Sequence, residues 1–306
     1  MRRRNRALVC GACCLLSVAP PALRAQTDVT AWPQVRTELI ALDPQGDLLP
    51  GVASDTLRVE EDGKPQQIDE VKPADEPQSV CILIDSSGSM YERLDSVRHA
   101  ALRLLDNLPP QDEVCVADFS YRLYIDQTLT ADRQLAKSAL SHVKAVGGTA
   151  LRNTLIDISD YLNRAAQNRD RAVILLSDSI DNASDIDDHE MRYQIELRGG
   201  MELHIICVPP DLGRRLEPRF HNNQKSALHL TSTFGGLSYF PRNEADLDES
   251  VDHLVSAMQS RYVLTYNTAN TVRDGKQRQV GIQFDKAHQK ARAVIRAQEA
   301  YYAPAL

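Results

Sequence analysis

The sequence predicts an α/β fold: a doubly wound, mostly parallel sheet with helices on both faces, plus a small β unit formed by the two flanks. Apolar runs typical of buried strands alternate with amphipathic helix patterns between residues 79 and 260. Short strand and turn patterns occupy residues 35–75 and return after residue 260. The 306-residue chain is 42% hydrophobic, which suits a globular protein with a real core.

Residues 1–25 are expected to be an export signal outside the fold. A basic start from Arg2 to Arg6 precedes an apolar stretch from Ala7 to Val18, which is too short to span a bilayer. Leu23-Arg24-Ala25 then resembles a cleavage site. We therefore expect an exported chain without a transmembrane segment, located in the periplasm, at the cell surface or outside the cell.

The N-terminal flank, residues 26–78, is expected to be rich in β structure. A turn at Glu61–Lys64 indicates a hairpin. The remaining predictions for this flank are strands at Val35–Leu42, Thr56–Glu60 and Pro65–Ile68, and a linker at Lys72–Pro77.

Residues 79–260 are expected to form the main domain. Its predicted strands are Val80–Ile84, Glu113–Phe119, Leu123–Leu129, Ala172–Leu176, Glu202–Val208 and Leu237–Phe240. One predicted helix has Leu94, Val97 and Leu104 on its apolar face and ends near Pro109. The other predicted helices occupy Ala131–Val146, Ala150–Ala166, Glu190–Leu197, Ala227–Phe234 and Glu244–Gln259. Residues 261–306 return to β character, and we expect them to pack with the N-terminal flank through strands at Arg261–Tyr266, Gln279–Phe284 and Ala291–Ile295.

Charge and cysteine content restrict the classes of function. The formal net charge is −7, and residues 26–306 hold 30 basic and 42 acidic side chains, a poor match for nucleic acid or an anionic membrane. Three cysteines remain after residue 25: Cys81, Cys115 and Cys207. Each sits in an apolar run, so we expect small buried hydrophobic side chains, with a Cys81–Cys115 bridge between neighbouring strands as the alternative.

Polar side chains follow two of the predicted buried strands. Asp85, Ser87 and Ser89 come directly after the first strand, and Asp178 follows the strand that ends at Leu176. Thr149 lies between them, after two glycines and at the start of a predicted helix. Ligands of open α/β sheets bind outside the carboxyl ends of the strands, so these five residues are the candidate site.

This set resembles the metal-ion-dependent adhesion site of von Willebrand factor type A domains, whose pattern is Asp-x-Ser-x-Ser, then Thr, then Asp. The flanks resemble a bacterial von Willebrand-related family in the hairpin at Val59–Gln66 and in the motif at Ala300–Pro304. The resemblance implies direct ligation by the hydroxyls and ligation by the two Asp residues often through water. It also implies that a partner protein supplies an Asp or Glu. The family usually has Gly after the last Asp, where this chain has Ser179.

Oxygen ligands of this kind select a hard divalent cation, with Mg²⁺ expected first and Mn²⁺ or Ca²⁺ as alternatives. The function expected is a metal-dependent adhesion or assembly module. A structural scaffold with a vestigial site is the alternative. A hydrolase is the least expected class, because the chain lacks a second Asp at position 87 and a Gly-x-Ser-x-Gly motif.

Other polar and aromatic groups are expected to be structural. Asp181, Asp185, Asp187 and Asp188 are expected to form a solvated loop, with a second cation site as the alternative. Two further sets are expected to serve ordinary surface or core packing: His189, His204, His221 and His229, and the pairs Tyr239-Phe240 and Tyr301-Tyr302.

Overall fold

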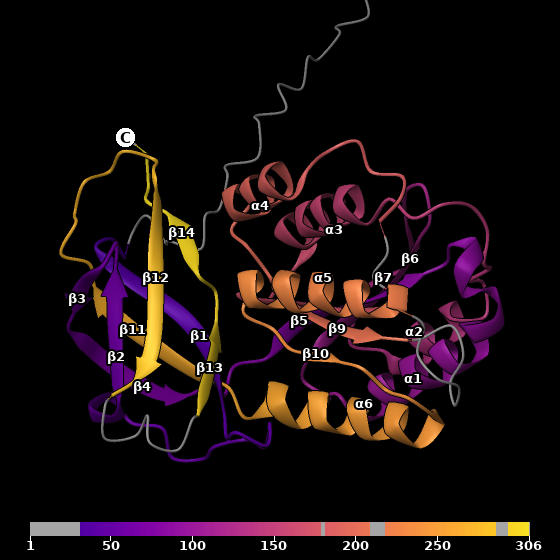
Figure 1. The fold of residues 1–306 in the computed structure, drawn as a ribbon, viewed down its shortest axis with the longest axis horizontal. Helices are drawn as coiled ribbons and strands as arrows, with labels where there is room; N and C mark the ends of the chain where they lie inside the picture. Colours follow the sequence, from indigo (N-terminus) through magenta and orange to yellow (C-terminus); the bar gives the residue numbers. More distant parts are fainter. Residues whose placement is uncertain (1–30, 179–180, 209–217, 286–292, 306) are drawn as a thin grey trace, which may run out of the picture.

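The computed structural model describes residues 31–178, 181–208, 218–285 and 293–305, so the predicted export signal lies outside the described residues. Two parts lie side by side in Figure 1. A six-stranded sheet covered by helices forms one part, and strands from both flanks of the chain form the other. Within the described ranges, no helix is both long and apolar enough to cross a membrane.

The six-stranded sheet has the strand order β10-β9-β8-β5-β6-β7, and its pairs are parallel except for the antiparallel pair of β6 and β7. The central strand β5 (Gln78–Asp85) is buried along its whole length. The other strands are β6 (Glu113–Phe119), β7 (Leu123–Thr130), β8 (Asp170–Ser177), β9 (Glu202–Cys207) and β10 (Ser238–Tyr239). The predicted doubly wound α/β fold is confirmed. Below, the carboxyl edge is the edge at which β5 and β8 end, and the amino edge is the edge at which they begin.

Helices cover both faces of this sheet (Figure 1). One face carries α1 (Leu94–Asn107), α2 (Arg133–Ala139) and α6 (Glu244–Gln259). The other carries α3 (Leu151–Ala165), α4 (Asp188–Leu197) and α5 (Pro218–Phe234). Successive side chains of a strand point to opposite faces, so Ile82 and Leu83 belong to two different cores.

The preferred interpretation of the cysteines is wrong for two of the three. Cys81 and Cys115 form a disulfide between β5 and β6, whereas Cys207 is buried with its Sγ 3.6 Å from Asp178 O. The two bonded cysteines lie directly opposite each other in the parallel register, with their Cα atoms 4.6 Å apart. That separation suits a disulfide. The sequence did not favour the bridge, because the apolar runs around the cysteines do not show which residues lie opposite each other. The alternative bridge is therefore correct.

Two predicted helices have different lengths in the structure. The helix predicted at Ala131–Val146 ends at Ala139. Tighter turns follow it, which bury Val143 and let the Val146 amide donate to Ser86 O at 2.7 Å. The chain thus leaves the helix early in order to reach the carboxyl edge. Helix α5 begins at Pro218, well before the predicted Ala227, because the polar residues preceding Ala227 hide the apolar periodicity.

The flanks form a β unit of two four-stranded sheets with one shared core. Terminal strands from both ends of the chain pair in each sheet, as expected: β1 with β11, and β2 with β12. The first sheet contains β13 (Val294–Ala297), β1 (Gln34–Leu42), β11 (Tyr262–Asn267) and β4 (Ile68–Pro73), and the second contains β14 (Ala300–Tyr302), β12 (Gln277–Phe284), β2 (Leu57–Glu61) and β3 (Lys64–Gln66). The linker predicted at Lys72–Pro77 is shorter, because Lys72 and Pro73 pair with β11.

A buried carboxylate ties the two ends of the β unit together. Glu61 is 2% exposed and accepts hydrogen bonds from the hydroxyls of Tyr266 at 2.9 Å, Tyr301 at 2.8 Å and Thr268 at 2.5 Å. The predicted hairpin after Glu61 is present, with Asp62 and Gly63 at φ values of 49° and 73° that suit a tight hairpin turn. Tyr301 thus packs in the core, as expected.

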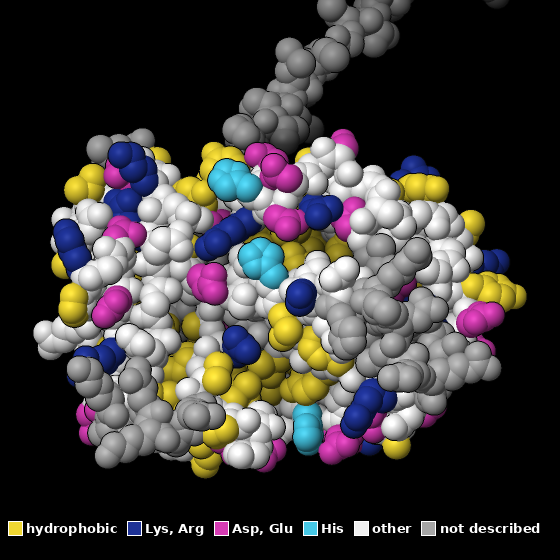
Figure 2. Space-filling model, in the orientation of Figure 1, with side chains coloured by type: hydrophobic (Ala, Val, Ile, Leu, Met, Phe, Trp, Pro, Cys, Tyr) yellow, Lys and Arg dark blue, Asp and Glu magenta, His cyan; other side chains and the backbone are white. Residues whose placement is uncertain are grey.

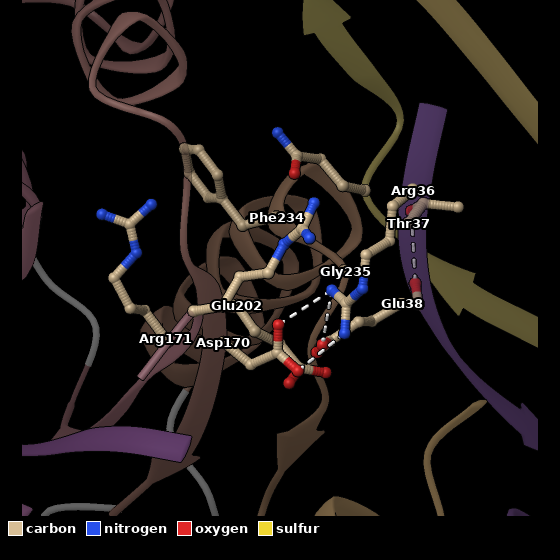
Figure 3. A pocket seen from close by; sticks show the side chains of 10 residues that line it. Arg36, Thr37, Glu38, Asp170, Arg171, Glu202, Phe234 and Gly235 are labelled. Atoms are coloured by element: carbon tan, nitrogen blue, oxygen red, sulfur yellow. Dashed lines mark hydrogen bonds and ion pairs between the residues drawn. The ribbon is translucent and has the colours of Figure 1, made fainter. Parts of the chain in front are cut away.

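The β unit contacts the sheet through a cluster of charges at the amino edge. Arg36 on β1 donates from both terminal nitrogens to the two carboxylate oxygens of Asp170 on β8, each at 2.8 Å (Figure 3). Glu38 and Glu202 converge on the same small cavity of about 40 Å³. Burial raises the pKa of Glu38 well above its usual range. Burial also acts to raise the pKa of Asp170, but hydrogen bonds with Glu38 and Arg36 outweigh it and lower that pKa.

Candidate metal centre

Two of the five predicted ligands lie at the point where the strand order reverses. Asp85 is the last residue of β5, and Asp178 directly follows β8. These strands pair in parallel, with Ile84 opposite Leu176, so both carboxylates reach the carboxyl edge together. Both are buried, at 0% exposure for Asp85 and 2% for Asp178. The edge therefore concentrates two acidic groups in a place that solvent hardly reaches.

Asp85 is a buried carboxylate surrounded by neutral donors. Its Oδ1 accepts from the backbone amide of Ser87 at 2.9 Å, and its Oδ2 accepts from the hydroxyl of Ser177 at 2.6 Å. Burial raises the pKa of Asp85 to about 6, and the nearby charge of Asp178 acts in the same direction. No ion pair from the described residues reaches Asp85. Its negative charge therefore lacks the positive partner that a buried carboxylate normally has.

The two predicted serine ligands connect the carboxylates. The hydroxyls of Ser87 and Ser89 lie 3.1 Å apart, and Ser89 donates to Asp178 Oδ2 at 3.0 Å. Both serines belong to the tight segment after β5, in which a 3₁₀ turn spans Gly88–Arg93. Hydrogen bonds thus link Ser87 to Asp85 and to Ser89, and Ser89 to Asp178, and the last two join side chains at both ends.

Thr149, the fifth predicted ligand, reaches this place through its loop. It is 1% exposed and lies just before α3. Gly88 N donates to Gly147 O at 2.9 Å, which holds the loop against the serine segment. Gly147 has a φ of +92°, which favours glycine at that position. Among the described residues, the Thr149 side chain makes no hydrogen bond to the other four.

Arg93 is a site residue that the sequence analysis missed. Its Nη1 lies 3.2 Å from Asp178 Oδ2 and also donates to Val208 O at 3.2 Å. The residue is 7% exposed, so this is a buried ion pair. The signal available was a basic residue one turn after Ser89, a position that is usually solvent-exposed at a helix start. The chain therefore supplies a positive charge to one carboxylate of the site.

The residues present fit a hard divalent cation. Their side-chain donors are all oxygens, from two carboxylates and three hydroxyls, the kind that Mg²⁺, Mn²⁺ and Ca²⁺ prefer. Within the described part of the chain, no group of three or more His, Cys, Asp and Glu side chains is placed to hold a metal ion. At this edge the hydroxyls would therefore have to complete the ligand set. The unbalanced charge of Asp85 is the feature that a bound cation would satisfy.

The acidic segment after the site has structural partners. Asp181 accepts from the Arg152 amide at 2.8 Å and from the Ser184 hydroxyl at 2.8 Å. Asp187 caps α4 by accepting from the Glu190 amide at 2.8 Å. These bonds order the loop and explain its acidic composition. Ser179, which stands where the resembled family has Gly, lies outside the described residues.

The remaining candidates mostly pack as expected. His204 is fully buried, with its Nε2 3.3 Å from Glu202 Oε2. His189 and His229 are exposed. The side chain of His221 lies outside the described residues. Tyr239 packs against two of the hydrophobic cores. Tyr302 makes an edge contact with Tyr193 of α4, with ring centroids 5.5 Å apart.

Comparison with known proteins identifies the domain. Residues 80–180 match the family model described as von Willebrand factor type A domain. An uncharacterised protein of Synechocystis sp. is 32% identical over 115 residues, which cover 36% of this chain and 27% of that protein. The inter-alpha-trypsin inhibitor heavy chain H4 of Bos taurus is 30% identical over 97 residues, which cover 30% of this chain and 11% of that protein.

Among solved structures, one described as von Willebrand factor type A from Catenulispora acidiphila aligns with 89% of this chain and 74% of its own. Its sequence identity is 16% and its TM-score is 0.49. The aligned stretches of the two curated relatives are well under two thirds of those proteins. The family match includes Asp85, Ser87, Ser89, Thr149 and Asp178 within its limits. This chain therefore contains a von Willebrand factor type A domain.

Proposed function

We propose that this chain is an exported protein-binding module for adhesion or assembly. It captures an Asp or Glu side chain of a partner protein through a divalent cation. Mg²⁺ is the first choice, and Mn²⁺ or Ca²⁺ can replace it. Asp85, Ser87, Ser89, Thr149 and Asp178 would hold the cation. The observation that carries the proposal is Asp85, a fully buried carboxylate whose described partners are neutral donors.

The charge of the site supports capture of an acidic group. Two carboxylates balance one divalent cation, and the hydroxyls add no charge. Arg93 adds a positive charge beside Asp178 at 3.2 Å, so a site holding its cation has one positive charge in excess. A carboxylate from outside would balance that excess. Such an electrostatic match favours an acidic partner over a neutral one.

Export is supported by two independent features. The basic and apolar pattern of residues 1–25 is typical of a signal peptide. The Cys81–Cys115 disulfide belongs to the oxidising compartments that exported proteins reach. Binding is favoured over turnover because position 87 holds Ser in place of a second Asp and the serines lack a Gly-x-Ser-x-Gly motif.

A second candidate function is a scaffold whose metal site has lost its role. The ion pair between Arg93 and Asp178 favours it, since a built-in cation already neutralises one of the two acidic ligands. The two functions differ in one measurable property. The first requires saturable binding of a divalent cation, and the second does not.

The test is a calorimetric titration of Mg²⁺ into the chelator-treated chain, beside the Asp85→Ala variant. Saturable binding in the wild type that disappears in Asp85→Ala is the expected result. Asp181→Ala is a matched control, because it removes a nearby carboxylate that serves the loop, and it should retain Mg²⁺ binding. Absence of binding in the wild type, or equal binding in Asp85→Ala, would overturn the proposal in favour of the scaffold.

A further inference from the structure

The most exposed large hydrophobic side chains of the described residues gather around the candidate metal centre. Tyr91 is 75% exposed, and Tyr121 and Val146 are each 67% exposed, more than any other large hydrophobic side chain in the described ranges. Hydrophobic side chains are visible at the edge of the molecule farthest from the β unit in Figure 2. Scattered exposed hydrophobic residues are ordinary, but several around one site call for an explanation.

The segments that carry these three side chains contact one another. Gly88, near Tyr91, donates to Gly147 O at 2.9 Å, and Val146 donates to Ser86 O at 2.7 Å. The Tyr121 ring lies on the glycine pair before Thr149, where a Cβ added to Gly147 would come within 2.9 Å of a ring carbon. We call Tyr91, Tyr121 and Val146 the apolar rim. The rim is built on the same loops that present the proposed ligands.

A hollow connects Tyr91 of the apolar rim with Ser89, one of the proposed ligands. It has a volume of about 420 Å³ and is lined by Gly88, Ser89, Tyr91, Glu92 and Arg93. Ser89 is a proposed ligand, and Tyr91 belongs to the rim. A partner chain whose carboxylate reaches the cation would therefore place an adjacent residue in this hollow, beside the Tyr91 ring.

The chemistry of the apolar rim indicates what that adjacent residue is. Tyrosine offers an apolar ring with a polar tip, and it is enriched where protein partners bury each other's side chains. A nearby tyrosine is already used: the guanidinium of Arg122 covers the Tyr124 ring at 5.1 Å from its centroid. The Arg122–Tyr124 pair includes none of the rim residues, and the exposed rings of Tyr91 and Tyr121 would be stabilised by contact with apolar surface.

We propose that the apolar rim docks a partner segment in which an aromatic or large aliphatic residue lies next to the acidic residue. This inference rests on the proposed function, because the cation would fix the carboxylate. The rim then selects among acidic segments, so that an acid flanked by small polar residues binds more weakly. Burial of one apolar side chain against the rim corresponds to about a tenfold difference in affinity.

The test uses synthetic peptides with one central Glu whose neighbours are Tyr and Leu in one set and Ser in the other. Binding to the full chain is measured by fluorescence polarisation in Mg²⁺. We expect the Tyr and Leu set to bind about tenfold more tightly. In Tyr91→Ser/Val146→Ser, which leaves Tyr121 on its glycines, this preference should vanish while calorimetric Mg²⁺ affinity stays unchanged. Equal binding of both sets to the wild type would overturn the inference.

Two controls separate this inference from the proposed function. Leu135→Ser removes a side chain of α2 that is 50% exposed and lies outside the rim, and it should keep the preference for apolar neighbours. Peptides with Gln in place of Glu, and Glu peptides in chelator, should not bind. A preference for apolar neighbours that survives both changes would support the rim and refute capture through a cation. Cation-dependent binding without that preference would support capture through a cation and refute the rim. Absence of binding to every peptide would refute both.

Discussion

Two buried carboxylates at opposite edges of the six-stranded sheet, Asp170 and Asp85, have different kinds of partner. At the amino edge, Asp170 receives both terminal nitrogens of Arg36, and Glu202 faces His204 at 3.3 Å. At the carboxyl edge, Asp85 is met by a hydroxyl and an amide. The chain thus supplies Asp170 with a countercharge where two of its parts must stay joined. Asp85 has no ion-pair partner among the described residues, and it lies at the edge where a ligand from solution would bind.

This contrast distinguishes charges that stabilise the fold from a carboxylate that is proposed to bind a ligand. A charge pair that closes within the chain holds the β unit against the sheet, and removing one member leaves the other buried alone. A carboxylate with no internal countercharge contributes little to the fold and is available for a cation. Asp178 lies between these cases, since Arg93 pairs with it inside the proposed site. Three substitutions test this contrast.

The largest effect is expected at the amino edge. Arg36→Met should lower the free energy of unfolding by about 4 kcal/mol, because the carboxylate of Asp170 would stay buried without its bidentate partner. Urea unfolding measures this loss, and Mg²⁺ affinity at the other edge should not change. Lys72→Met is the matched control in the same β unit. It breaks an exposed pair with Glu70 and should cost less than about 1 kcal/mol. Equal losses in the two variants would show that the amino edge is not held by charge.

An intermediate effect is expected for Arg93→Met, which leaves Asp178 without its arginine. In chelator the variant should be about 2 kcal/mol less stable, since Asp178 would keep the Ser89 hydrogen bond but lose its countercharge. Saturating Mg²⁺ should restore that loss, because the cation would take the place of the guanidinium. Thermal unfolding with and without Mg²⁺ measures the difference, with Arg93→Lys as the charge-conserving control. A loss of stability that Mg²⁺ does not restore would show that Arg93 serves the fold and not the proposed cation site.

The smallest effect is expected for Glu38→Gln. Burial raises the pKa of Glu38, so the folded chain retains a proton that the unfolded chain releases near the ordinary value of 4.5. The contribution of Glu38 to the free energy of unfolding is therefore fully present at low pH. It is lost as the pH rises toward the pKa of Glu38 in the folded chain. Glutamine resembles the protonated acid, so the variant should differ by less than about 1 kcal/mol near pH 5 and gain relative stability at higher pH. Urea unfolding across pH measures the trend, and a difference that does not change with pH would contradict it.

Much of the fold was predictable because it depends on patterns along the chain. The continuous apolar run before Asp85 identifies a buried strand, and the turn at Asp62-Gly63 identifies a hairpin. Asp85, Ser87, Ser89 and Asp178 were located by the strands that they end or follow, and Thr149 by the helix that it precedes. What the patterns did not reveal depends on register. The Cys81–Cys115 bridge and the two sheets of the β unit arise from which residue lies opposite which.

Sequence alone therefore determined the fold class, the strands that carry Asp85 and Asp178, and the oxygen donors that favour a hard cation. Only the tertiary structure decided which charges are paired. It brought Arg93 onto Asp178, across 85 positions in the chain, and Arg36 onto Asp170, across 134. It also brought together the segments that carry the exposed Tyr91, Tyr121 and Val146 side chains. The reason is physical: periodicity is a local property of the backbone, whereas charge pairing and exposure depend on neighbours that folding brings from far along the chain.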